Sequence, residues 1–567
     1  MPRLRASLAG SLDLLRSRAL ALLQAEADWF EDAEPRFTLV SPLASGVDQI
    51  AARAALDAGW ELQAVLPLRR GDYRALQDTD SARELDALLA AATCVLELPG
   101  DADDPLDAYV MAGRATVAHA DLLVAVWDGL PARGRGGTAQ TVETALLRGT
   151  PILHLPVDQA EPRLLWSALD PAVITHTGNH RGSPATSDLV GRVLASLLAP
   201  PRSEIERRFY GRFLSERPYS LRWRIEYPLL MTLAGAHRLS RSDLLARPGV
   251  DAMRTEWQSY RDQCVGCHGV KAEIDWLEEA YAWADRLATH FAQAYRSSHI
   301  FNFLLAATGA LIGLSGLVTE IDPTAAAVAE FLIIVAVVAN TLWGSRRCWH
   351  QRWLDYRQLA ERLRPMRSLK LLGIAAPDPP GSTAEPIASR WVDWYAGSVW
   401  RSAGCPSGQL TPERARTLAE AIAARELDPQ IAYHRRSAAQ SRRFDERLET
   451  VALTLFSCTI LVSLAVIVGL QVVPDLVAAH SGAITFLSAG LPAVGTAIFG
   501  IRVQGDYGNV AARSGNTAIL LERVSAELGA GASLDRAADL TEQAARIMFQ
   551  DLDQWRLVAE LHELSVG

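Results

Sequence analysis

The stretch Ile300–Val318, IFNFLLAATGALIGLSGLV, is one of four uninterrupted apolar segments that decide the fold of this chain. The other three are Ala325–Trp343, Val451–Val473 and Ala483–Ile501. Each is close to the roughly 20 mostly apolar residues that a helix needs to cross a bilayer. Residues 319–324 and 474–482 join the members of each pair, and such short connections cannot return across a membrane. The sequence predicts two antiparallel membrane hairpins; four buried helices of a soluble protein are the alternative.

Charged residues predict the orientation of the hairpins. Their tips carry Glu320, Asp322 and Asp475 but neither Lys nor Arg. The opposite ends of the spans are basic, with Arg296, Arg346, Arg347, Arg352, Arg442, Arg443, Arg447 and Arg502. Because Lys and Arg stay on the cytoplasmic side of a membrane, we expect both termini in the cytoplasm. Residues 1–22 lack the apolar core of a signal peptide.

The composition argues against two classes of protein. The 567 residues carry a net charge of −9, whereas a nucleic-acid-binding protein needs a concentrated basic surface to neutralise phosphates. We therefore expect no nucleic acid among its partners. Six scattered cysteines give no disulfide framework.

The first 200 residues differ from the rest, because short apolar runs alternate there with amphipathic helical stretches. The predicted strands are Phe37–Ser41, Leu62–Leu66, Cys94–Leu98, Leu122–Trp127 and Pro151–Leu155. The predicted helices are Leu14–Phe30, Gly46–Ala58, Ser81–Ala91, Pro105–Ala118, Thr138–Arg148 and Thr186–Leu198. This alternation predicts a Rossmann-like α/β domain with a parallel sheet. Such sheets bind ligands beyond the carboxyl ends of their strands.

Two loops at those ends are candidate binding sites. The first contributes Ser41, Ser45, Gly46 and Asp48; Gly46 allows close backbone approach, and the free N–H groups of the next helix face any anion placed there. A capping box formed by Ser45 and Asp48 is the alternative role for these residues. The second loop contributes Trp127, Asp128, Gly129, Gly136, Gly137 and Thr138. Its glycines allow a tight turn of backbone amides around a phosphate.

These residues resemble a known superfamily. The stretch Ser41–Asp48, the group Asp107, Ala108 and Tyr109 with Gly113 and Arg114, and the run Ala120–Gly129 leading to Gly136–Thr138 resemble the SLOG superfamily. That group is related to Lonely-Guy and DNA-processing Rossmannoid proteins and includes the cytoplasmic region of melastatin-type TRP channels. The resemblance implies a pocket for a nucleotide-derived ligand, of the ADP-ribose or cyclic-nucleotide type, and no further cofactor.

Two departures from the SLOG pattern bear on catalysis. The chain begins at a helix, without the strand and glycine-rich turn that usually open this domain. The enzymatic relatives place a Glu three residues after the Thr of their Gly-Thr element, where this chain has Thr141 and the nearest acid is Glu143. Since each helical residue turns about 100°, that carboxylate is displaced by about 200°. This favours binding over catalysis, so no catalytic residue is predicted.

The membrane half resembles the SLATT domain, a two-span module of bacterial conflict systems. Helices are predicted on either side of each hairpin, at Ala272–Arg296, Cys348–Leu369, Tyr433–Glu449 and Tyr507–Leu528. The predicted domains are then a SLOG-like domain (1–200), a helical connector (201–271), a first SLATT-like unit (272–375), a linker with amphipathic helices (376–432) and a second SLATT-like unit (433–567).

The motif Cys264-Val265-Gly266-Cys267-His268 matches the attachment site of c-type haem. Haem attachment occurs outside the cytoplasm, where we do not place this segment. We expect reduced thiols and no bound metal, with haem and zinc as the alternatives.

Polar residues within the spans are candidate pore residues, because their burial in lipid is costly. They are Glu330, Asn302 and Asn340. Four weakly polar helices are too few for a pore, so conduction would require a homo-oligomer in the lipid bilayer.

We therefore expect a multi-pass effector of the bacterial inner membrane. Its α/β domain would bind a nucleotide-derived signal and gate an oligomeric pore or disrupt the membrane, in defence against phage or in related conflict. The alternative is a membrane-tethered enzyme that processes a nucleotide or N-glycoside, with Asp128 or Glu143 as its acid. A structural scaffold is a third possibility.

Overall fold

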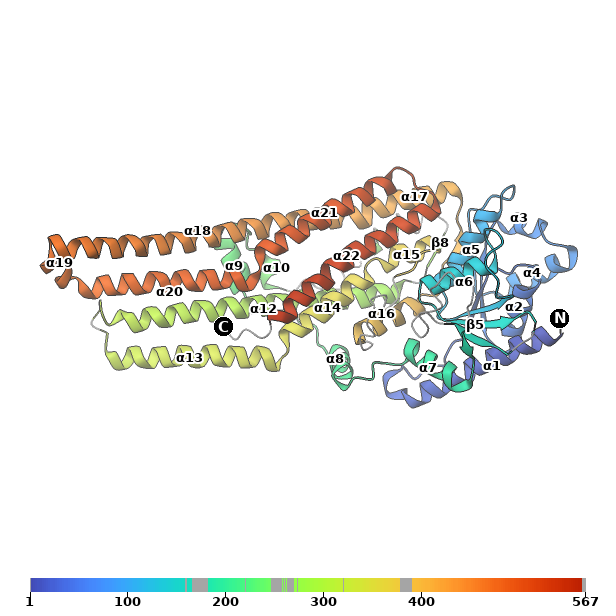
Figure 1. Ribbon diagram of the computed structural model, residues 1–567, viewed down its shortest axis with the longest axis horizontal. Coiled ribbons are helices and arrows are strands. Elements are labelled where there is room, and N and C mark those ends of the chain that lie inside the picture. Colours follow the sequence, from blue (N-terminus) through green and yellow to red (C-terminus); the bar gives the residue numbers. More distant parts are fainter. Residues whose placement is uncertain are drawn as a thin grey trace.

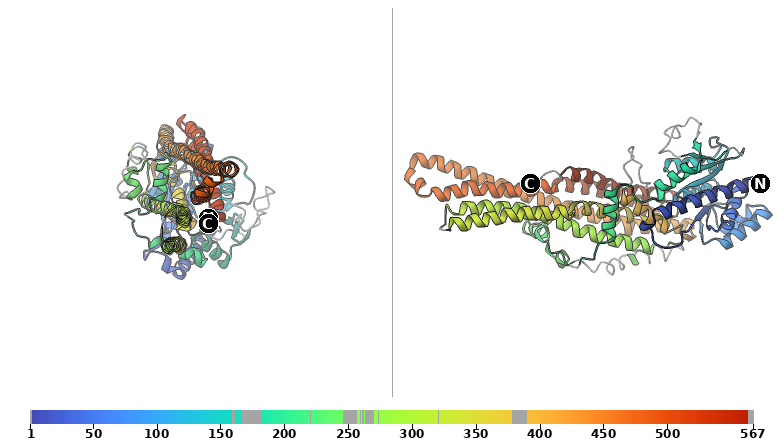
Figure 2. Two further views of the ribbon diagram at one scale, coloured as in Figure 1. Left: turned by 90° about the vertical axis from the view of Figure 1, so that its left-hand side faces the viewer. Right: turned by 90° about the horizontal axis from the view of Figure 1, so that it is seen from below.

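The chain forms an elongated molecule, with an α/β domain at the end that holds the N-terminus and four long helices at the other (Figure 1 and Figure 2). The computed structural model describes residues 2–158, 161–165, 182–219, 221–245, 257–258, 260, 262, 270–272, 274–319, 321–377 and 390–562. The Cys264–His268 motif, Glu320 and the predicted linker beyond Pro377 up to residue 389 lie outside the described residues.

The predicted parallel α/β fold of the N-terminal region is confirmed. Strands β1 (Thr38–Ser41), β2 (Glu61–Leu66) and β3 (Cys94–Glu97) pair in parallel, and so do β4 (Leu123–Trp127) and β5 (Ile152–Pro156). Val65 and Leu66 are successive residues of β2, and both are fully buried. Because successive side chains of a strand point to opposite faces, both faces of this sheet are covered.

The helices between the strands lie within two residues of their predicted bounds. They are α2 (Val47–Asp57), α4 (Thr79–Ala91), α5 (Leu106–Ala118), α6 (Thr138–Leu147) and α7 (Ser187–Leu198). The prediction for the first helix, Leu14–Phe30, is wrong at both ends, because α1 spans Pro2–Ala25 and the short helix η1 (Ala27–Trp29) follows it. Leu8 and Leu15 share a buried cluster with Val190 and Leu194 of α7, which explains the earlier start. A further short helix, α3 (Arg70–Ala75), follows β2.

The described strands form two sheets whose edges the sequence did not predict. The first sheet has the order β1-β2-β3-β9-β8, and the second β4-β5-β6-β7. β9 (Ser407–Gln409) pairs in parallel with β3 although more than 300 residues separate them. β8 (Val270–Lys271), β6 (Arg163–Leu165) and β7 (Ser183–Pro184) form antiparallel pairs at the outer edges. Residues 407–409 belong to the segment predicted as linker and amphipathic helices, and they extend the N-terminal sheet.

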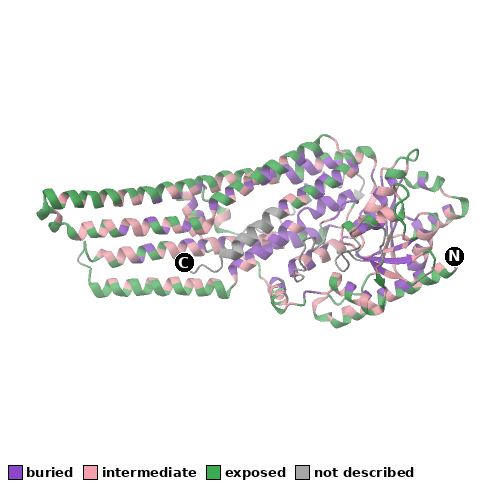
Figure 3. Cartoon of the chain, in the orientation of Figure 1, coloured by how far each residue is buried: buried purple, intermediate pink, exposed green. Residues whose placement is uncertain are grey.

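The C-terminal region is helical, and four of its helices are long and apolar enough to cross a membrane. They are α12 (Asp275–Ser315), α13 (Pro323–Arg346), α18 (Asp428–Val472) and α20 (Ser481–Gly505), and α19 (Pro474–Ala479) lies in the second hairpin tip. Many of their apolar side chains face outward; Leu332 is 58% and Ile460 is 68% exposed, and exposed residues predominate along α13 and α18 in Figure 3. Core helices of a soluble protein would bury these side chains, so the exposure favours the membrane-spanning interpretation.

The two hairpins are built alike. α12 and α18 each continue beyond their span as one helix, so the helices predicted at Ala272–Arg296 and Tyr433–Glu449 are not separate elements. After each hairpin the backbone turns at a residue in the left-handed conformation, Cys348 (φ 50°) or Asp506 (φ 48°). The helices that follow, α14 (Trp349–Leu363) and α21 (Tyr507–Gly529), pack along α12 and α18.

One hydrophobic core joins the α/β domain to the helical region. It contains Leu62 and Leu96 of the sheet together with Leu371, Leu418 and Leu521 of later helices. The helices involved include α15 (Met366–Leu372), α17 (Pro412–Ile422), the π-helix η3 (Ala423–Leu427) and α22 (Leu534–His562). The other helices of the described residues are α8 (Glu204–Leu214), α9 (Glu226–Leu233), α10 (Arg241–Leu244) and α16 (Trp391–Ser402).

Candidate functional site

The loop after β1 leaves the start of α2 open. Ser41 is buried, and its hydroxyl accepts a hydrogen bond from the Leu43 N–H at 3.2 Å. The Ser45 hydroxyl lies 2.7 Å from the Ser81 hydroxyl, and the Asp48 carboxylate accepts a hydrogen bond from the Ala44 N–H at 3.3 Å. Gly46 precedes α2 with φ 95°, a conformation that favours glycine. Among the described residues, no side chain caps α2, so the capping-box alternative is wrong.

The loop after β4 is folded on itself. Trp127 is buried, and its indole N–H donates to the Leu130 carbonyl at 3.0 Å. One oxygen of Asp128 accepts a hydrogen bond from the Leu130 N–H at 3.1 Å, and the other pairs with Arg133 at 3.0 Å. Gly129 lies between them. The Asp128 carboxylate therefore holds the loop in shape.

The glycines before α6 come close to α5. The Gly136 N–H donates to the Gln140 side chain at 2.7 Å. With φ 81° at Gly136, a Cβ there would lie 2.7 Å from Cβ of Tyr109. Gly137 instead faces open space, and Thr138 is exposed at the first position of α6. Backbone amides at this turn are accessible to a ligand.

Two tyrosines, Tyr73 of α3 and Tyr109 of α5, link the two loops. Burial raises the pKa of Tyr73, and the nearby Asp48 carboxylate and Tyr109 raise this pKa further. Tyr109 in turn contacts Gly136. Loops that follow four strands thus meet around these residues. Tyr109 is part of the SLOG-like motif, whereas Tyr73 carried no sequence signal.

Asp48 is the perturbed acid of this site. Burial raises its pKa to about 6, although the hydrogen bond from Ala44 lowers it. Perturbed carboxyl groups concentrate at functional sites, and this one lies at the carboxyl edge of a parallel sheet. We call Ser41, Ser45, Gly46, Asp48, Tyr73, Tyr109 and the stretch Trp127–Thr138 the loop site.

The acids considered for catalysis have different surroundings. Asp128 is engaged within its own loop, and Glu143 is exposed on α6. Among the described residues, no group of three or more His, Cys, Asp or Glu side chains could hold a metal ion. The Cys264–His268 motif is not among those residues.

Two of the candidate pore residues connect the first two spans. The side-chain amide of Asn340 in α13 donates to the Ser298 backbone carbonyl at 3.2 Å and to the side-chain oxygen Oδ1 of Asn302 at 2.7 Å. Asn302 donates to the Thr341 hydroxyl at 3.0 Å, and Arg224 donates to Asn340 at 2.7 Å. The side-chain amides of Asn302 and Asn340 therefore find hydrogen-bond partners within one chain.

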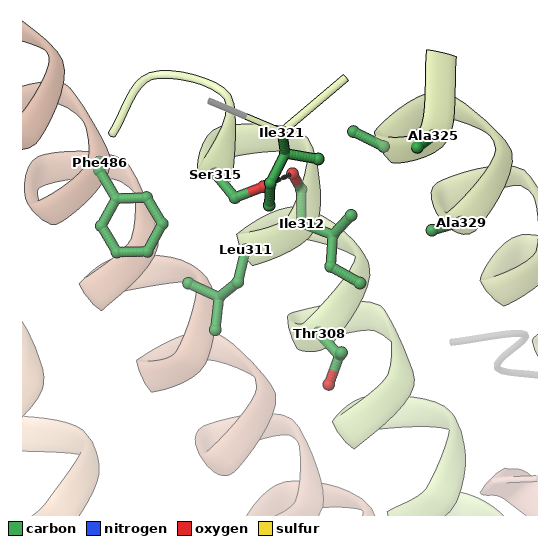
Figure 4. A pocket seen from close by; sticks show the side chains of 9 residues that line it. Thr308, Leu311, Ile312, Ser315, Ile321, Ala325, Ala329 and Phe486 are labelled. Atoms are coloured by element: carbon green, nitrogen blue, oxygen red, sulfur yellow. Dashed lines mark hydrogen bonds between the residues drawn. The ribbon is translucent and has the colours of Figure 1, made fainter. Parts of the chain in front are cut away.

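Glu330 is different, because it is exposed on α13 and has no hydrogen-bond or ion-pair partner among the described residues. Its carboxylate lies beside α12, where a Cβ added at Gly313 would be 3.4 Å from Oε2. The preceding residue, Ala329, lines an apolar cavity of about 390 Å³ near the first hairpin tip (Figure 4). That cavity is also lined by Thr308, Leu311, Ile312, Ser315, Ile321, Ala325, Ala326 and Phe486.

Ion pairs clamp the α/β domain to the last helix. Arg114 of α5 lies 2.9 Å from the Asp539 carboxylate and 3.9 Å from Glu542 of α22. Arg148, which follows α6, also pairs with Glu542. Glu542 is buried and accepts a hydrogen bond from the Ala376 N–H at 3.1 Å. Helices α5 and α6, which contact the glycine-rich turn before Thr138, are thereby attached to the helical region. We call the ion pairs of Arg114 and Arg148 with Glu542 the Glu542 clamp.

In comparisons with known proteins, one family model matches part of the chain. No curated protein matches the chain, and no solved structure matches it. The family described as "Protein of unknown function (DUF4231)" matches residues 279–369, which run from α12 through the first hairpin into α15.

Proposed function

We propose that this protein is a membrane effector in which the loop site binds a nucleotide-derived signal and controls the four-span bundle. The ligand is of the ADP-ribose or cyclic-nucleotide type. The observation that carries the proposal is the convergence of Asp48, Tyr73, Tyr109 and Gly136 beside helices that are clamped to α22. This arrangement supports the SLOG-like interpretation of the N-terminal region.

The chemistry of the loop site suits a phosphorylated nucleoside. Unpaired amides at the start of α2 and around Gly137 favour phosphate. The partly buried carboxyl group of Asp48 and the phenols of Tyr73 and Tyr109 would hydrogen-bond a sugar or base. The partly buried ring of Tyr109 also suits stacking on a base.

The helical bundle supports the effector half of the proposal. The repeated plan of a long helix, a return span and a helix packed back supports the SLATT-like interpretation. Arg346 and Arg502 lie at the bundle end that faces the α/β domain, whereas Asp322 and Asp475 lie at the tips. This distribution supports cytoplasmic termini and a place in the bacterial inner membrane, with a role in defence against phage.

Ligand binding would act on the bundle through the shared core and the Glu542 clamp. A near-complete switch requires the ligand to prefer one state by about 5.5 kcal/mol. Ligand sites in several copies of a homo-oligomer would supply this preference together. The exposed apolar surface of the spans leaves room for such assembly within the lipid bilayer.

The decisive experiment measures ion flux from liposomes that contain the purified full-length protein. Single ADP-ribose and cyclic-nucleotide compounds are added, and each is recovered for mass analysis. We expect one compound to trigger flux and to be recovered intact. A cleaved compound without flux would instead establish the tethered enzyme, and an absence of both would leave a scaffold.

Variants separate the binding step from the membrane step. Gly137→Val adds a side chain in open space at an extended residue, so it should block ligand binding without unfolding the loop. Asp128→Ala should also abolish ligand binding, because it removes the carboxylate that holds the loop in shape. Glu330→Ala should change conduction and leave ligand affinity unchanged. Ligand-gated flux that survives both loop variants would show that the proposed pocket is wrong.

A further inference from the structure

A second cavity lies where the first hairpin leaves the membrane. It has a volume of about 340 Å³. One wall is formed by Ile205, Arg208, Phe209 and Arg212, which lie at helical spacing on one face of α8. The other wall is formed by Ser345, Arg346 and Cys348 at the end of α13. We call this cavity the α8 groove; Figure 1 shows α8 below α14, beyond the end of α13.

The opposite face of α8 fixes the helix in place. Tyr210 and Phe213 are buried in an aromatic core. Arg207 pairs with Glu26 at 2.8 Å, and the Glu206 carboxylate accepts a hydrogen bond from the Trp391 N–H at 2.9 Å. The groove face is therefore held in place; Phe209 also packs against this core, whereas the side chains of Arg208 and Arg212 make none of these contacts.

Positive charge gathers in the groove. Within the described part of the chain, no carboxylate pairs with Arg208, Arg212 or Arg346. The Arg212 guanidinium lies over the Phe209 ring, 5.7 Å from its centroid. Three guanidinium groups around one cavity attract a phosphate, which Arg binds through two parallel hydrogen bonds.

Apolar side chains place the groove at the membrane surface. Ile205 is 65% exposed and Trp343 of α13 is 57% exposed. Trp at the end of a span occupies the headgroup level. Arg346 follows Trp343 by three residues, or about 4.5 Å along a helix, and so reaches the lipid phosphates. A short helix with exposed apolar and basic residues is typical of the membrane interface.

We propose that the α8 groove binds the headgroup of an anionic phospholipid from the cytoplasmic leaflet. Arg208, Arg212 and Arg346 would hold the phosphate, while Ile205 and Phe209 would contact the glycerol and the upper acyl chains. The site requires the four-span interpretation but no ligand at the loop site. It would fix the depth and position of α8 at the base of the bundle.

The test uses the full-length protein, delipidated in detergent. Phosphatidylglycerol or phosphatidylcholine with the same acyl chains is titrated in, and bound lipid is counted by native mass spectrometry. We expect tighter binding of phosphatidylglycerol, and a loss of about tenfold or more in its affinity for R208Q/R212Q. The matched control is R442Q/R443Q, which removes two exposed arginines before the third span and should leave the affinity unchanged.

Three further measurements distinguish a built site from diffuse attraction. Ser345→Trp fills the groove but keeps every charge, and it should weaken phosphatidylglycerol binding as strongly as R208Q/R212Q does. Equal affinities for the groove variants and the control would overturn the proposal. Two results would assign the groove to a soluble anion instead. One is complete displacement of phosphatidylglycerol by millimolar inorganic phosphate. The other is binding of poly-glutamate that is as tight as that of phosphatidylglycerol and is lost in R208Q/R212Q.

Discussion

At the scale of single residues, Asp48 should make the stability of the protein depend on pH. Its pKa is about 6 in the folded chain against an ordinary 3.8, so the folded state binds more protons between these values. The contribution of this group to the free energy of unfolding therefore falls as pH rises from about 4 to 6. Asp48→Asn keeps an oxygen for the Ala44 N–H and should raise the free energy of unfolding by about 1 to 3 kcal/mol at neutral pH.

Unfolding followed by intrinsic fluorescence at about pH 4.5 and 7.5 would check this expectation, with the gain confined to the higher pH. Asp13→Asn, at an exposed position of α1, is the control and should have no comparable effect. Equal or lower stability of Asp48→Asn at neutral pH would contradict the role of burial at this site.

A buried residue pair, Lys370 and His119, joins the α/β domain to α15. The Lys370 ammonium is buried, donates to the Gly404 carbonyl at 2.6 Å and lies 3.7 Å from the centroid of the Trp400 ring. His119 lies 3.2 Å from that ammonium and contacts the Gly373 carbonyl at 3.1 Å. Burial and the Lys370 charge hold the pKa of His119 well below its ordinary value, so His119 stays neutral in the folded chain.

His119 should destabilise the folded chain in acid. Because its folded pKa lies below the unfolded value near 6.5, the unfolded state binds more protons as pH falls below about 6.5. His119→Phe keeps a flat ring stacked on Trp400 and should make the melting temperature less sensitive to pH between about 4.5 and 7. An unchanged pH profile would exclude His119 as a source of the acid sensitivity.

At the scale of elements, the π-helix η3 is held by a buried ion pair. Glu426 of η3 pairs with Arg367 of α15 at 2.6 Å, and both side chains are at most 4% exposed. Removing one partner of such a pair leaves a buried charge and costs about 3 to 5 kcal/mol. Glu426→Gln should therefore lower the free energy of unfolding by roughly that amount, as measured by denaturant unfolding in detergent.

Glu420→Gln, an exposed change one helix earlier, is the matched control for Glu426→Gln. The double variant R367M/E426L should recover most of the loss, because paired apolar side chains leave no buried charge. A double variant that is no more stable than Glu426→Gln would indicate a role beyond charge compensation.

At the scale of the whole molecule, the Glu542 clamp should transmit the state of the α/β domain. Glu542→Ala leaves Arg114 and Arg148 without this carboxylate, which is 9% exposed. We expect flux at saturating ligand to fall at least about tenfold, the effect of roughly 1.4 kcal/mol of lost coupling, with ligand affinity changed less than about twofold. Flux and equilibrium binding are measured on the same preparation.

Glu527→Ala breaks an exposed pair with Arg536, about 55% exposed, and should leave flux intact. A melting temperature lowered equally by Glu542→Ala and Glu527→Ala would argue against a special role for the clamp. Unchanged flux in Glu542→Ala would assign the coupling to the shared core instead.

Part of the loop site was predictable from the sequence. Gly46, Asp48, Gly136 and Gly137 follow strands that the apolar pattern predicted, so their place at the carboxyl edge was predictable. Tyr73 was not, because it lies in a short helix without a motif and meets Asp48 only through folding. The capping box was locally plausible, yet Ser45 bonds Ser81, which lies on α4.

Local periodicity and segment length were enough to predict the parallel strands, most of the helix bounds and four helices apolar enough to span a membrane. Other features became visible only in the folded chain: β9 extends the first sheet, one core unites the sheet with α15, α17 and α22, and Arg114 and Arg148 meet Glu542. These contacts join residues hundreds of positions apart. No local pattern encodes them, because their free energy comes from surfaces that meet only once the chain has folded.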